Sequence, residues 1–396
     1  MATQTVLDGL EDEPETIDDS GLEIERGRDA EIEVPFDPTK IDIIVKAMTV
    51  SSLESRLENR ELDLTPDFQR QANVWNAHRK ARLIESVLLR IPLPSFYFSE
   101  DIDGSYAVVD GLQRLCALFH FMRPELLNRA TKTQMSPLVL NGLQYLKELE
   151  GKRFSDLDRK FQRRIAEVEI TANIIRASTP PAVKFNVFAR LNQGGMPLNA
   201  QEIRNAIFPG VWRDHLREMA ESAPFRTATE GKIKTERQQD IELVLRFVAL
   251  WRLGPPFHRP AHQTLDEFLN ATVEDKLTHW TDSDWIAVKE AFFRSLDICK
   301  QVFGRHVFRK SVSSERRKPI NRGLFEAEMV VASEFSAEHA RAVVANKQTV
   351  ADEFRRAMLL DTEFEQALLY ATGSASASTS RIKTLSGVFS KVIDGH

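Results

Sequence analysis

A short polar joint between two apolar stretches is the first place where this sequence could do chemistry. Residues 106–121 read YAVVDGLQRLCALFHF, in which a strand-like run ends at Asp110-Gly111 and a helix-like run follows at once. We expect Asp110 to cap the helix, Gln113 to complete a capping box, and Gly111 to allow a close approach of the backbone. The first-turn amides and the guanidinium of Arg114 would then suit a phosphate group.

The same residues also suit an ordinary capped helix with a surface arginine, and two further polar clusters favour the functional interpretation. The first is the pair Gln69 and Arg70 in the loop sequence PDFQRQANVW. The second is FARLNQGGMPLNAQEIRNA at 188–206, which contains Arg190, Asn192, Gly194 and Gly195. Its alternative interpretation is a capped turn between two helices, whose polar groups satisfy one another.

The elements that must position these clusters are mixed in type. Asp103-Gly104 predicts a hairpin turn before the strand that enters the joint, and Asn199 with Glu202 predicts a capping box. Periodicity and turn residues predict helices at 52–62, 78–90, 112–121, 182–192, 199–208, 240–253 and 282–303, and strands at 96–98, 105–110 and 168–177.

The predicted fold class is α+β, with a mixed domain followed by a helical one. We expect an acidic disordered tail at 1–35, a nucleotide- or DNA-binding α+β domain at 36–210, a helical domain at 211–371, and a linker with a C-terminal helix at 372–396. The linker is the small-residue stretch ATGSASASTSR at 371–381.

Composition excludes several classes of protein. The chain has 396 residues, 42% of them hydrophobic, which is enough for one large domain or two ordinary ones. It has no apolar run of 18 residues and no secretory signal, so we expect no membrane span and a cytoplasmic location. Cys116 and Cys299 are far apart and fit buried thiols in a reducing compartment.

Charge is distributed unevenly along the chain. The formal net charge is −5, while residues 1–35 hold twelve acids and two bases, so the remaining chain carries +5. The acidic tail could be a solvating segment, or it could mimic phosphate charge and cover the basic body.

One stretch, FGRHVFRKSVSSERRKPINRG at 303–323, is the candidate DNA-facing surface, and we call it the basic strip. Its predicted DNA contacts are Arg309, Lys310, Arg316, Arg317 and Lys318. The alternative is a solvated loop between helices.

The three ordered motifs VVDGLQRL, PDFQR…VW and F-x-RLN-x-GG-x-PLN-x-QEIRNA resemble the N-terminal domain family of GmrSD-type restriction endonucleases, over roughly residues 48–250. The resemblance implies a ParB/sulfiredoxin-like fold and a role in bacterial restriction or anti-phage defence. Residues 110–114 are similar to the family's Asp-Gly-Gln-Gln-Arg (DGQQR) motif, with Leu112 in place of the first glutamine. That motif implies binding and hydrolysis of a nucleoside triphosphate, with DNA cleavage or its control as the output.

Carried over by this resemblance, the catalytic candidates are Asp110, Gln113 and Arg114. Nucleotide or phosphate contacts would come from Gln69, Arg70, Gly111, Arg190, Asn192, Gly194 and Gly195. Mg²⁺ is the expected cofactor, with Asp110 as its candidate ligand.

Two departures keep other functions open. Leu112 could weaken hydrolysis, and the sequence shows no HNH nuclease constellation. Pro255, Pro256 and Pro260 prevent His258 and His262 from sharing a helix face. The chain could therefore be an NTPase or DNA nuclease, a sensor of nucleotide or DNA without chemistry, or an adaptor for a separate nuclease or defence subunit.

Overall fold

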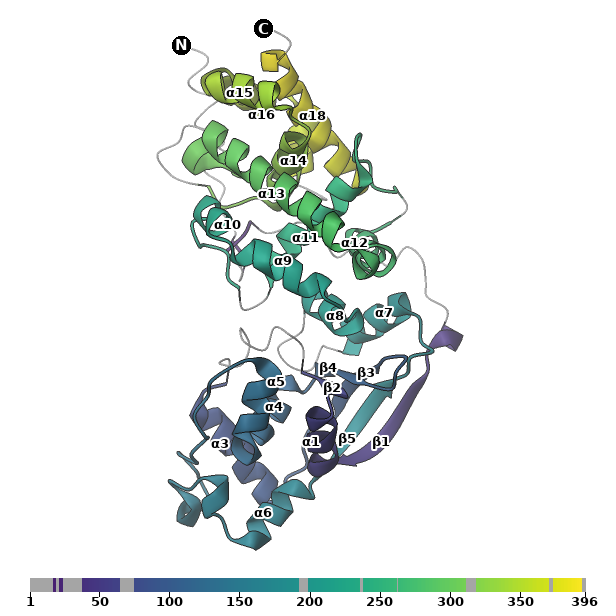
Figure 1. The fold of residues 1–396 in the computed structure, drawn as a ribbon, viewed down its shortest axis with the longest axis vertical. Coiled ribbons are helices and arrows are strands. Elements are labelled where there is room, and N and C mark those ends of the chain that lie inside the picture. The colour runs from purple at the N-terminus through teal and green to yellow at the C-terminus, as the bar shows by residue number, and fades with distance from the viewer. Residues whose placement is uncertain are drawn as a thin grey trace. The chain divides into compact units, whose positions relative to one another are not determined.

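The computed structural model divides the chain into two compact units (Figure 1). The sheet unit comprises residues 34–213, and the helical unit comprises residues 1–33 together with 214–396. The division falls within the first turn of helix α9 (Trp212–Glu221). The structure describes residues 17–18, 21–23, 38–64, 75–191, 199–235, 238–261, 263–310, 318–369 and 373–393.

A mixed five-stranded sheet forms the centre of the sheet unit, with the order β1-β5-β3-β4-β2. β1 is antiparallel to β5 and β3 to β4, whereas β5 is parallel to β3 and β2 to β4. β4, which leads into the joint, therefore has paired neighbours on both edges. The strands are β1 (Ile43–Thr49), β2 (Leu62–Asp63), β3 (Phe96–Glu100), β4 (Tyr106–Asp110) and β5 (Glu169–Ile175).

The β3–β4 hairpin confirms the predicted turn. Gly104 has φ +82°, a left-handed conformation that glycine adopts without steric cost. The Asp103 carboxylate accepts a hydrogen bond from the amide of Ser105 at 2.9 Å. Phe96 and Phe98 of β3 are fully buried, so the hairpin is fixed by its core face as well as by its turn.

In the sheet unit, α3 and α5 pack directly against α4, whose residues from Leu115 to Met122 are all buried. In Figure 1, α1, α3, α4, α5 and α6 lie on one side of the sheet. The bounds are α1 (Val50–Glu58), α3 (Ala77–Leu88), α4 (Leu112–Met122), α5 (Pro124–Thr131), α6 (Arg159–Ala166), α7 (Pro181–Leu191) and α8 (Ala200–Ile207).

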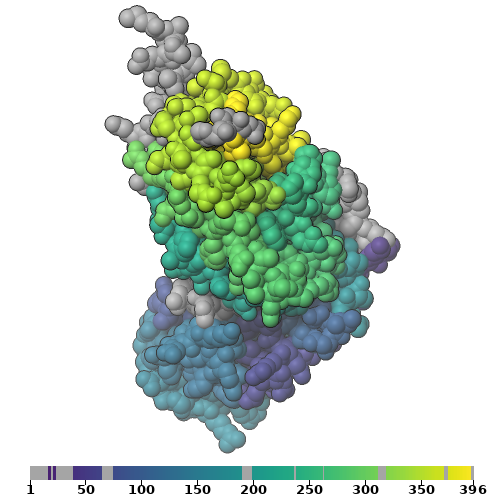
Figure 2. All heavy atoms as spheres, turned by 45° about the horizontal axis from the view of Figure 1, so that its top comes forward, coloured from purple at the N-terminus to yellow at the C-terminus, as the bar shows by residue number. Residues whose placement is uncertain are grey.

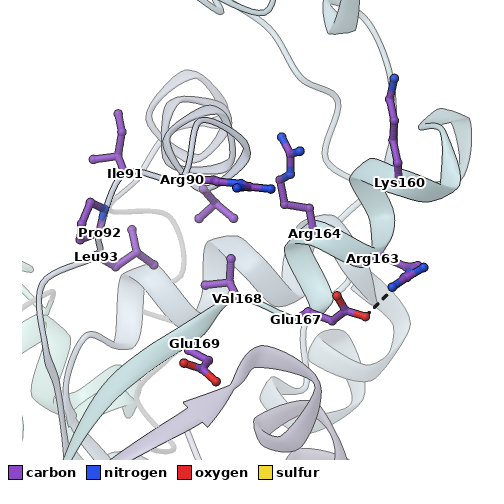
Figure 3. A pocket seen from close by; sticks show the side chains of 11 residues that line it. Arg90, Ile91, Pro92, Leu93, Lys160, Arg163, Arg164, Glu167, Val168 and Glu169 are labelled. Carbon is purple, nitrogen blue, oxygen red and sulfur yellow. Dashed lines mark hydrogen bonds and ion pairs between the residues drawn. The ribbon is translucent and has the colours of Figure 1, made fainter.

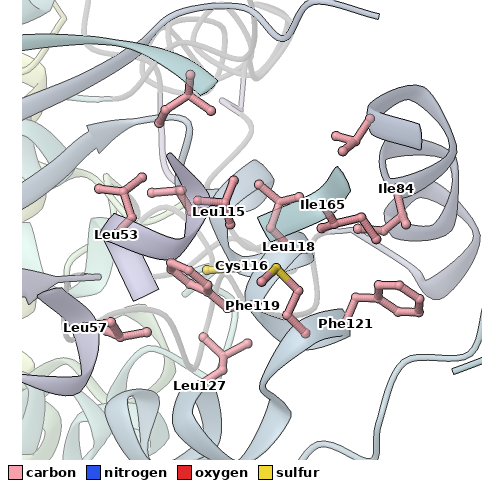
Figure 4. Packing of buried hydrophobic residues seen from close by; sticks show 14 of the residues in the cluster. Leu53, Leu57, Ile84, Leu115, Cys116, Leu118, Phe119, Phe121, Leu127 and Ile165 are labelled. Atoms are coloured by element: carbon pink, nitrogen blue, oxygen red, sulfur yellow. The ribbon is translucent and has the colours of Figure 1, made fainter. Parts of the chain in front are cut away.

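The apolar core of this unit holds α4 on several sides (Figure 4). Truncating one such side chain to alanine typically costs about 2–5 kcal/mol, so the axis of α4 is strongly fixed. Cys116 lies in this core, and burial raises the pKa of its thiol well above the ordinary value. The side chains around α4 include Leu53, Leu57, Ile84, Leu127 and Ile165.

The helical unit is built around α14, in which every residue from Arg322 to Ser333 is buried. It packs against α11, α13 and α18. In Figure 2 the yellow-green and yellow residues of α15, α16 and α18 share one face of this unit. The bounds are α10 (Ala223–Ala228), α11 (Gln239–Leu253), α12 (Leu265–Asp275), α13 (Asp282–Phe303), α14 (Arg322–Ser333), α15 (Ala337–Ala345), α16 (Lys347–Leu360), α17 (Thr362–Leu369) and α18 (Ala375–Ile393).

A buried ionic network joins α11, α14 and α18. Arg246 contacts Glu242 at 2.7 Å and Glu326 at 2.9 Å, and Arg381 contacts the second oxygen of Glu326 at 3.1 Å. A Cβ added at Gly323 would lie 2.6 Å from Nε of Arg381, so only glycine lets this arginine cross α14. Buried charges need such partners, because an unpaired charge is costly to remove from water.

The prediction of an α+β architecture is confirmed, and its ParB/sulfiredoxin-like detail stays a prediction. The linker predicted at 371–381 is wrong for residues 375–381, which form the start of α18. Ser374 caps this helix by accepting a hydrogen bond from the amide of Ala377 at 3.1 Å. Serine and alanine here serve close helix packing rather than chain flexibility. Strands β1 and β2 were not predicted, and the helix predicted at 52–62 ends at Glu58, so that Leu62 belongs to β2.

The prediction of a disordered tail is wrong for the residues of 1–35 that the structure describes. Leu22 is fully buried, and the amide of Glu23 donates to the carbonyl of Ile320 at 3.0 Å. None of the described helices is both long and apolar enough to cross a membrane.

Candidate functional site

The joint between β4 and α4 is a strand end followed by one left-handed glycine. Gly111 is the N-cap residue of α4, with φ +93°. A Cβ at this position would lie 2.3 Å from Cδ1 of Phe96, which no rotation of the new side chain could relieve. Both the backbone conformation and the close approach of the Phe96 ring therefore require glycine. The sequence prediction of a close approach is confirmed, and the approaching group is an aromatic ring.

A bulge in the sheet sets the direction of Asp110. The β3–β4 register shifts between Tyr97 and Phe98, which pair with Asp110 and Val108 respectively. Val109 is thus the extra residue on β4, immediately before the joint. Bulges often redirect side chains beside active sites, and here the bulge fixes which way the last residue of the strand points.

The predicted capping role of Asp110 is wrong. Asp110 still belongs to β4, and α4 begins with no side-chain cap at its N-terminus. Gly111 moves the helix start one residue along, and its carbonyl accepts the first helical hydrogen bond, from Leu115, at 2.9 Å. The capping box with Gln113 is therefore not formed. Oδ2 of Asp110 instead lies 2.9 Å from Nη2 of Arg114, one helical turn away.

Arg114 is held by the fold itself. Its guanidinium donates to the carbonyl oxygens of Pro94 and of Ser95, the latter at 3.1 Å. It also lies over the Phe96 ring, 4.4 Å from the centroid, and its side chain is only 12% exposed. Burial lowers the pKa of Arg114, an effect that the Asp110 carboxylate opposes. Arg114 thus fixes the entry to β3, a structural role that the sequence prediction did not include.

What the joint offers to a ligand is a carboxylate beside a helix N-terminus. The Asp110 side chain is 51% exposed, in contrast to Arg114. The first amides of α4 have no carbonyl partner four residues earlier, and the helix dipole adds positive potential there. Leu112, Gln113 and Arg114 are half-buried. The arrangement can bind an anion at the amides while Asp110 holds a cation or a water molecule beside it.

Several predicted contacts lie outside the described residues. Gln69 and Arg70 fall in 65–74, and Asn192, Gly194 and Gly195 fall in 192–198. Arg190 belongs to the last turn of α7, but its side chain is not described. Of the predicted phosphate and catalytic residues, the structure therefore brings together Asp110, Gly111, Gln113 and Arg114.

The third motif forms a buried polar helix against β4. Asn199 and Glu202 form the predicted capping box of α8, which confirms that prediction. Arg204 donates to Gln201 at 2.6 Å, and Gln201 donates to Asn205 at 3.0 Å. These three side chains are almost fully buried, and α8 packs on the strand that ends at Asp110.

This network shows that the polar groups of α8 satisfy one another. Because α8 packs on β4, this buried network supports the strand that leads into the joint, a contact that was not predicted from the sequence. The sequence showed that arginine, glutamine and asparagine occur together on one short helix, but not that they are buried; such groups are rarely fully buried without partners.

The basic strip is not an open cationic surface in the part that the structure describes. Arg309 is 1% exposed and lies 3.5 Å from Glu230. Lys310 pairs with Glu23 of the acidic segment, and Lys318 is half-buried. Arg309 therefore cannot reach DNA in this arrangement, which corrects that prediction. Arg316 and Arg317 lie outside the described residues.

No cluster of three or more potential metal-ligating histidine, cysteine, aspartate or glutamate side chains occurs among the described residues. Asp110 can thus offer Mg²⁺ one carboxylate. This fits an ion that is held largely by substrate phosphates and water, since Mg²⁺ commonly takes only one or two protein carboxylates.

Comparison with known proteins supports the family resemblance. Residues 52–209 match the family described as GmrSD restriction endonuclease, N-terminal domain. This segment contains the joint, the Gln69-Arg70 pair and the whole of α8. No curated protein and no solved structure matches the chain.

Proposed function

Residues 52–209 form a GmrSD restriction endonuclease N-terminal domain, and from this premise we propose that the chain binds and hydrolyses a nucleoside triphosphate within a bacterial restriction or anti-phage system. The single observation that carries the proposal is the joint. A half-exposed carboxylate ends β4 directly beside the N-terminus of α4, whose start is fixed by Gly111.

The amides of residues 112–114 would receive a phosphate group of the nucleotide. Asp110 would either hold Mg²⁺ or orient the attacking water, because its Oδ2 is engaged by Arg114 while the carboxylate remains half-exposed. Mg²⁺, when bound, would neutralise phosphate charge. Gln113 would position water or the nucleotide, and Leu112 would pack in the first turn.

Arg114 would stabilise the phosphate by its nearby positive charge rather than by two direct hydrogen bonds from its guanidinium. Its donors already serve Pro94, Ser95 and Asp110, so a bidentate phosphate contact would require it to release these groups. Gln69, Arg70, Arg190 and Asn192 would supply the remaining contacts from the other two motifs.

The engagement of Arg114 specifically favours a second candidate, a nucleotide or DNA sensor without turnover. A transition state gains most from donors that are aimed at its developing charge. A guanidinium bound to its own backbone would recognise an anion by charge while stabilising a transition state poorly. Such a protein would regulate a partner nuclease.

A nucleotide-induced thermal shift and phosphate release separate these functions. ATP, GTP, CTP and UTP would each be offered with Mg²⁺, with and without plasmid DNA, and a gel would score DNA cleavage. The variants are Asp110→Asn, which preserves shape, and Arg114→Lys, which retains charge but not the forked donor.

The expected result is a rise in melting temperature with at least one nucleotide, and phosphate release that Asp110→Asn abolishes in a folded protein. A thermal shift without turnover in the wild type would establish the sensor. Neither shift nor turnover with any nucleotide would overturn both nucleotide-based functions.

A further inference from the structure

A pocket in the sheet unit brings four cationic side chains opposite an apolar wall (Figure 3). It lies between the end of α3, the helix α6 and the start of β5, and has a volume of about 470 Å³. We call it the basic pocket. Its cationic side comprises Arg90, Lys160, Arg163 and Arg164, and its apolar side comprises Val87, Ile91, Pro92, Leu93 and Val168. Two carboxylates, Glu167 and Glu169, complete the lining, so the cations exceed the acids by two.

The cations of the basic pocket form only weak ion pairs, or none, with the described carboxylates. Among the described residues, no carboxylate lies within 4.0 Å of Arg90 or Arg164. Arg163 pairs with Glu167 at 3.3 Å and Lys160 with Asp158 at 3.6 Å, in both cases between largely exposed side chains. Exposed pairs of this kind contribute about 0–1 kcal/mol, so an incoming anion can replace them.

Arg164 has the one firm attachment, since its Nη1 donates to the carbonyl of Leu88 at 3.0 Å. This bond holds the guanidinium at the end of α3. In Figure 3, Arg90 and Arg164 extend toward the same space above Val168. Arg90 itself has φ +63°, which directs the chain into the following apolar segment 91–93.

Helix α6 carries its charges in an arrangement that does not serve its own stability. Arg159 and Arg163 are four residues apart, as are Lys160 and Arg164. Like charges at this spacing destabilise a helix by about 0.2–0.5 kcal/mol per pair. The sequence thus concentrates repulsive cations on one surface, and a polyanion bound there would relieve the repulsion.

The apolar side favours a ligand that is not a bare inorganic anion. Ile91 is 51% exposed, although it adjoins the buried Val87 and the half-buried Leu93. A volume in the range of about 300–1,000 Å³ accommodates a small organic ligand or one unit of a polymer. Phosphate would contact the cations while a sugar or base would cover the apolar residues.

We propose that the basic pocket binds the phosphodiester backbone of a DNA strand, with one nucleotide seated against Ile91, Pro92 and Leu93. The pocket offers no asparagine, glutamine or aromatic side chain to read a base edge. Contacts of arginine and lysine to phosphate position a strand without specifying its sequence. Binding is therefore independent of sequence. The choice of DNA as the polyanion rests on the proposed function.

The basic pocket is continuous with the joint along the chain. Its apolar segment ends at Leu93, and the next two residues, Pro94 and Ser95, are those whose carbonyl groups accept from Arg114. A strand bound in the pocket would thus contact the segment that Arg114 holds beside Asp110. The chain provides a short physical connection between DNA binding and the nucleotide site.

The test compares a neutralised pocket with an equal loss of charge elsewhere. The pocket variant is Arg90→Gln/Lys160→Gln/Arg163→Gln, which leaves Arg164 to cap α3. The matched control is Lys300→Gln/Arg341→Gln/Lys347→Gln, because these three exposed cations of the helical unit have no carboxylate within 4.0 Å among the described residues. Fluorescence anisotropy would measure the affinity of the full chain for a labelled 20-nucleotide single strand and for its duplex at several salt concentrations.

We expect the pocket variant to bind the single strand at least about tenfold more weakly than the control. The slope of log K against log salt should become shallower by about 2, since each lost phosphate contact on a single strand contributes about 0.7. A larger loss for the duplex than for the single strand would place the duplex rather than one strand in the pocket, and would overturn the proposed form of the ligand. Equal affinity and slope in the variant and the control would overturn the site.

An acidic peptide is the competing occupant. A labelled peptide of alternating glutamate and leucine would be titrated against the same three proteins. If only the pocket variant lost peptide binding while DNA binding was unchanged, the pocket would be a protein-docking site and the proposal would be wrong. The nucleotide-induced thermal shift of the wild type is measured separately, so failure of the nucleotide function is not confused with failure of this site.

Discussion

The two cationic regions of this chain, the basic strip and the basic pocket, differ in what neutralises them. In the strip, Arg309 and Arg322 are buried and Lys310 is paired, with Glu230, Asp18 and Glu23 as their carboxylate partners. In the pocket, Arg90, Lys160 and Arg163 are exposed and bonded weakly or not at all to described carboxylates. A dense run of positive charge in a sequence therefore does not by itself mark a binding surface. Whether such a run can bind an anion depends on where its carboxylate partners lie in the folded chain.

The acidic N-terminal segment supplies two of the partners of the strip. Arg322 donates to the carboxylate of Asp18 and to the backbone carbonyl of Glu23, and Lys310 contacts the Glu23 carboxylate. Of the two roles considered for the acidic tail, the described residues favour covering of the basic body over simple solvation. This covering is part of the folded helical unit, because Leu22 between the two acids is fully buried.

The largest expected effect on stability is that of a substitution in the basic strip, at Arg322. Arg322→Ala should lower the free energy of unfolding by roughly 3 kcal/mol, because it leaves Asp18 and the side chain of Gln239 without their buried donor. Urea denaturation of the full chain measures the loss, with the exposed Arg341→Ala as control. A change in the free energy of unfolding below about 0.5 kcal/mol would mean that the ion pair of Arg322 contributes as little to stability as those of the pocket cations.

A smaller loss, roughly 2–3 kcal/mol, is expected for Gly111→Ala at the joint. The new Cβ would combine a left-handed φ with a contact of 2.3 Å to Phe96. Gly151→Ala is the matched control, since Gly151 has φ +78° but no atom within 4 Å of an added Cβ. The difference between the two melting curves isolates the ring contact. Equal losses would show that Phe96 yields, and that the joint is less rigid than described.

We expect the stability of the protein to depend on pH through Glu328, which lies beside the basic strip. Burial raises the pKa of this carboxyl well above its ordinary value, against the opposing effects of the Phe308 amide and Arg309. The folded state then binds the proton more tightly than the unfolded state. Stability should fall as pH rises from about 4.3 toward the raised pKa of the folded protein, by up to about 1.4 kcal/mol per pH unit.

Glu328→Gln cannot ionise, so it should be more stable than the wild type at pH 8 and lose this advantage toward pH 4.5. Melting temperatures of both proteins across this range measure the effect, and Glu290→Gln on the exposed side of α13 serves as control. A constant difference across pH would contradict a raised pKa for Glu328.

The smallest effect is expected in the pocket. Arg163→Gln should change the free energy of unfolding by less than about 0.5 kcal/mol, because its pair with Glu167 joins two largely exposed side chains. Urea denaturation of the full chain, as for Arg322→Ala, measures this change. A loss of more than about 1 kcal/mol would show that this cation supports the fold and would weaken its assignment to DNA.

Local chemistry was predictable where neighbours in sequence determine it. The Asp103-Gly104 turn and the Asn199–Glu202 capping box need only three or four residues, and both form as predicted. The strand–glycine–helix order of the joint was also predictable. The capping role of Asp110 was not, because it depends on the bulge at Val109 and on the ring of Phe96, which belong to the pairing of two strands.

The other differences between the predictions from sequence and the structure arise from contacts between residues far apart in the chain. Arg322 meets Asp18 across 304 positions of sequence, a separation that no local pattern reveals. The linker prediction failed because small residues favour both flexible segments and close helix packing. The basic pocket was missed because its lining comes from two segments, 87–93 and 160–169, that are far apart in the sequence, although RKFQRR already showed four cations at helical spacing.

The most direct test of the account is phosphate release by the full chain with Mg²⁺ and each of the four nucleotides, in wild type, Asp110→Asn and Asp103→Asn. The two substitutions remove the same charge, one from the last residue of β4 and one from the β3–β4 turn, and an asparagine at 103 can still accept a hydrogen bond from the Ser105 amide. We predict turnover in the wild type and in Asp103→Asn and none in Asp110→Asn. Undiminished turnover in Asp110→Asn would contradict a catalytic joint.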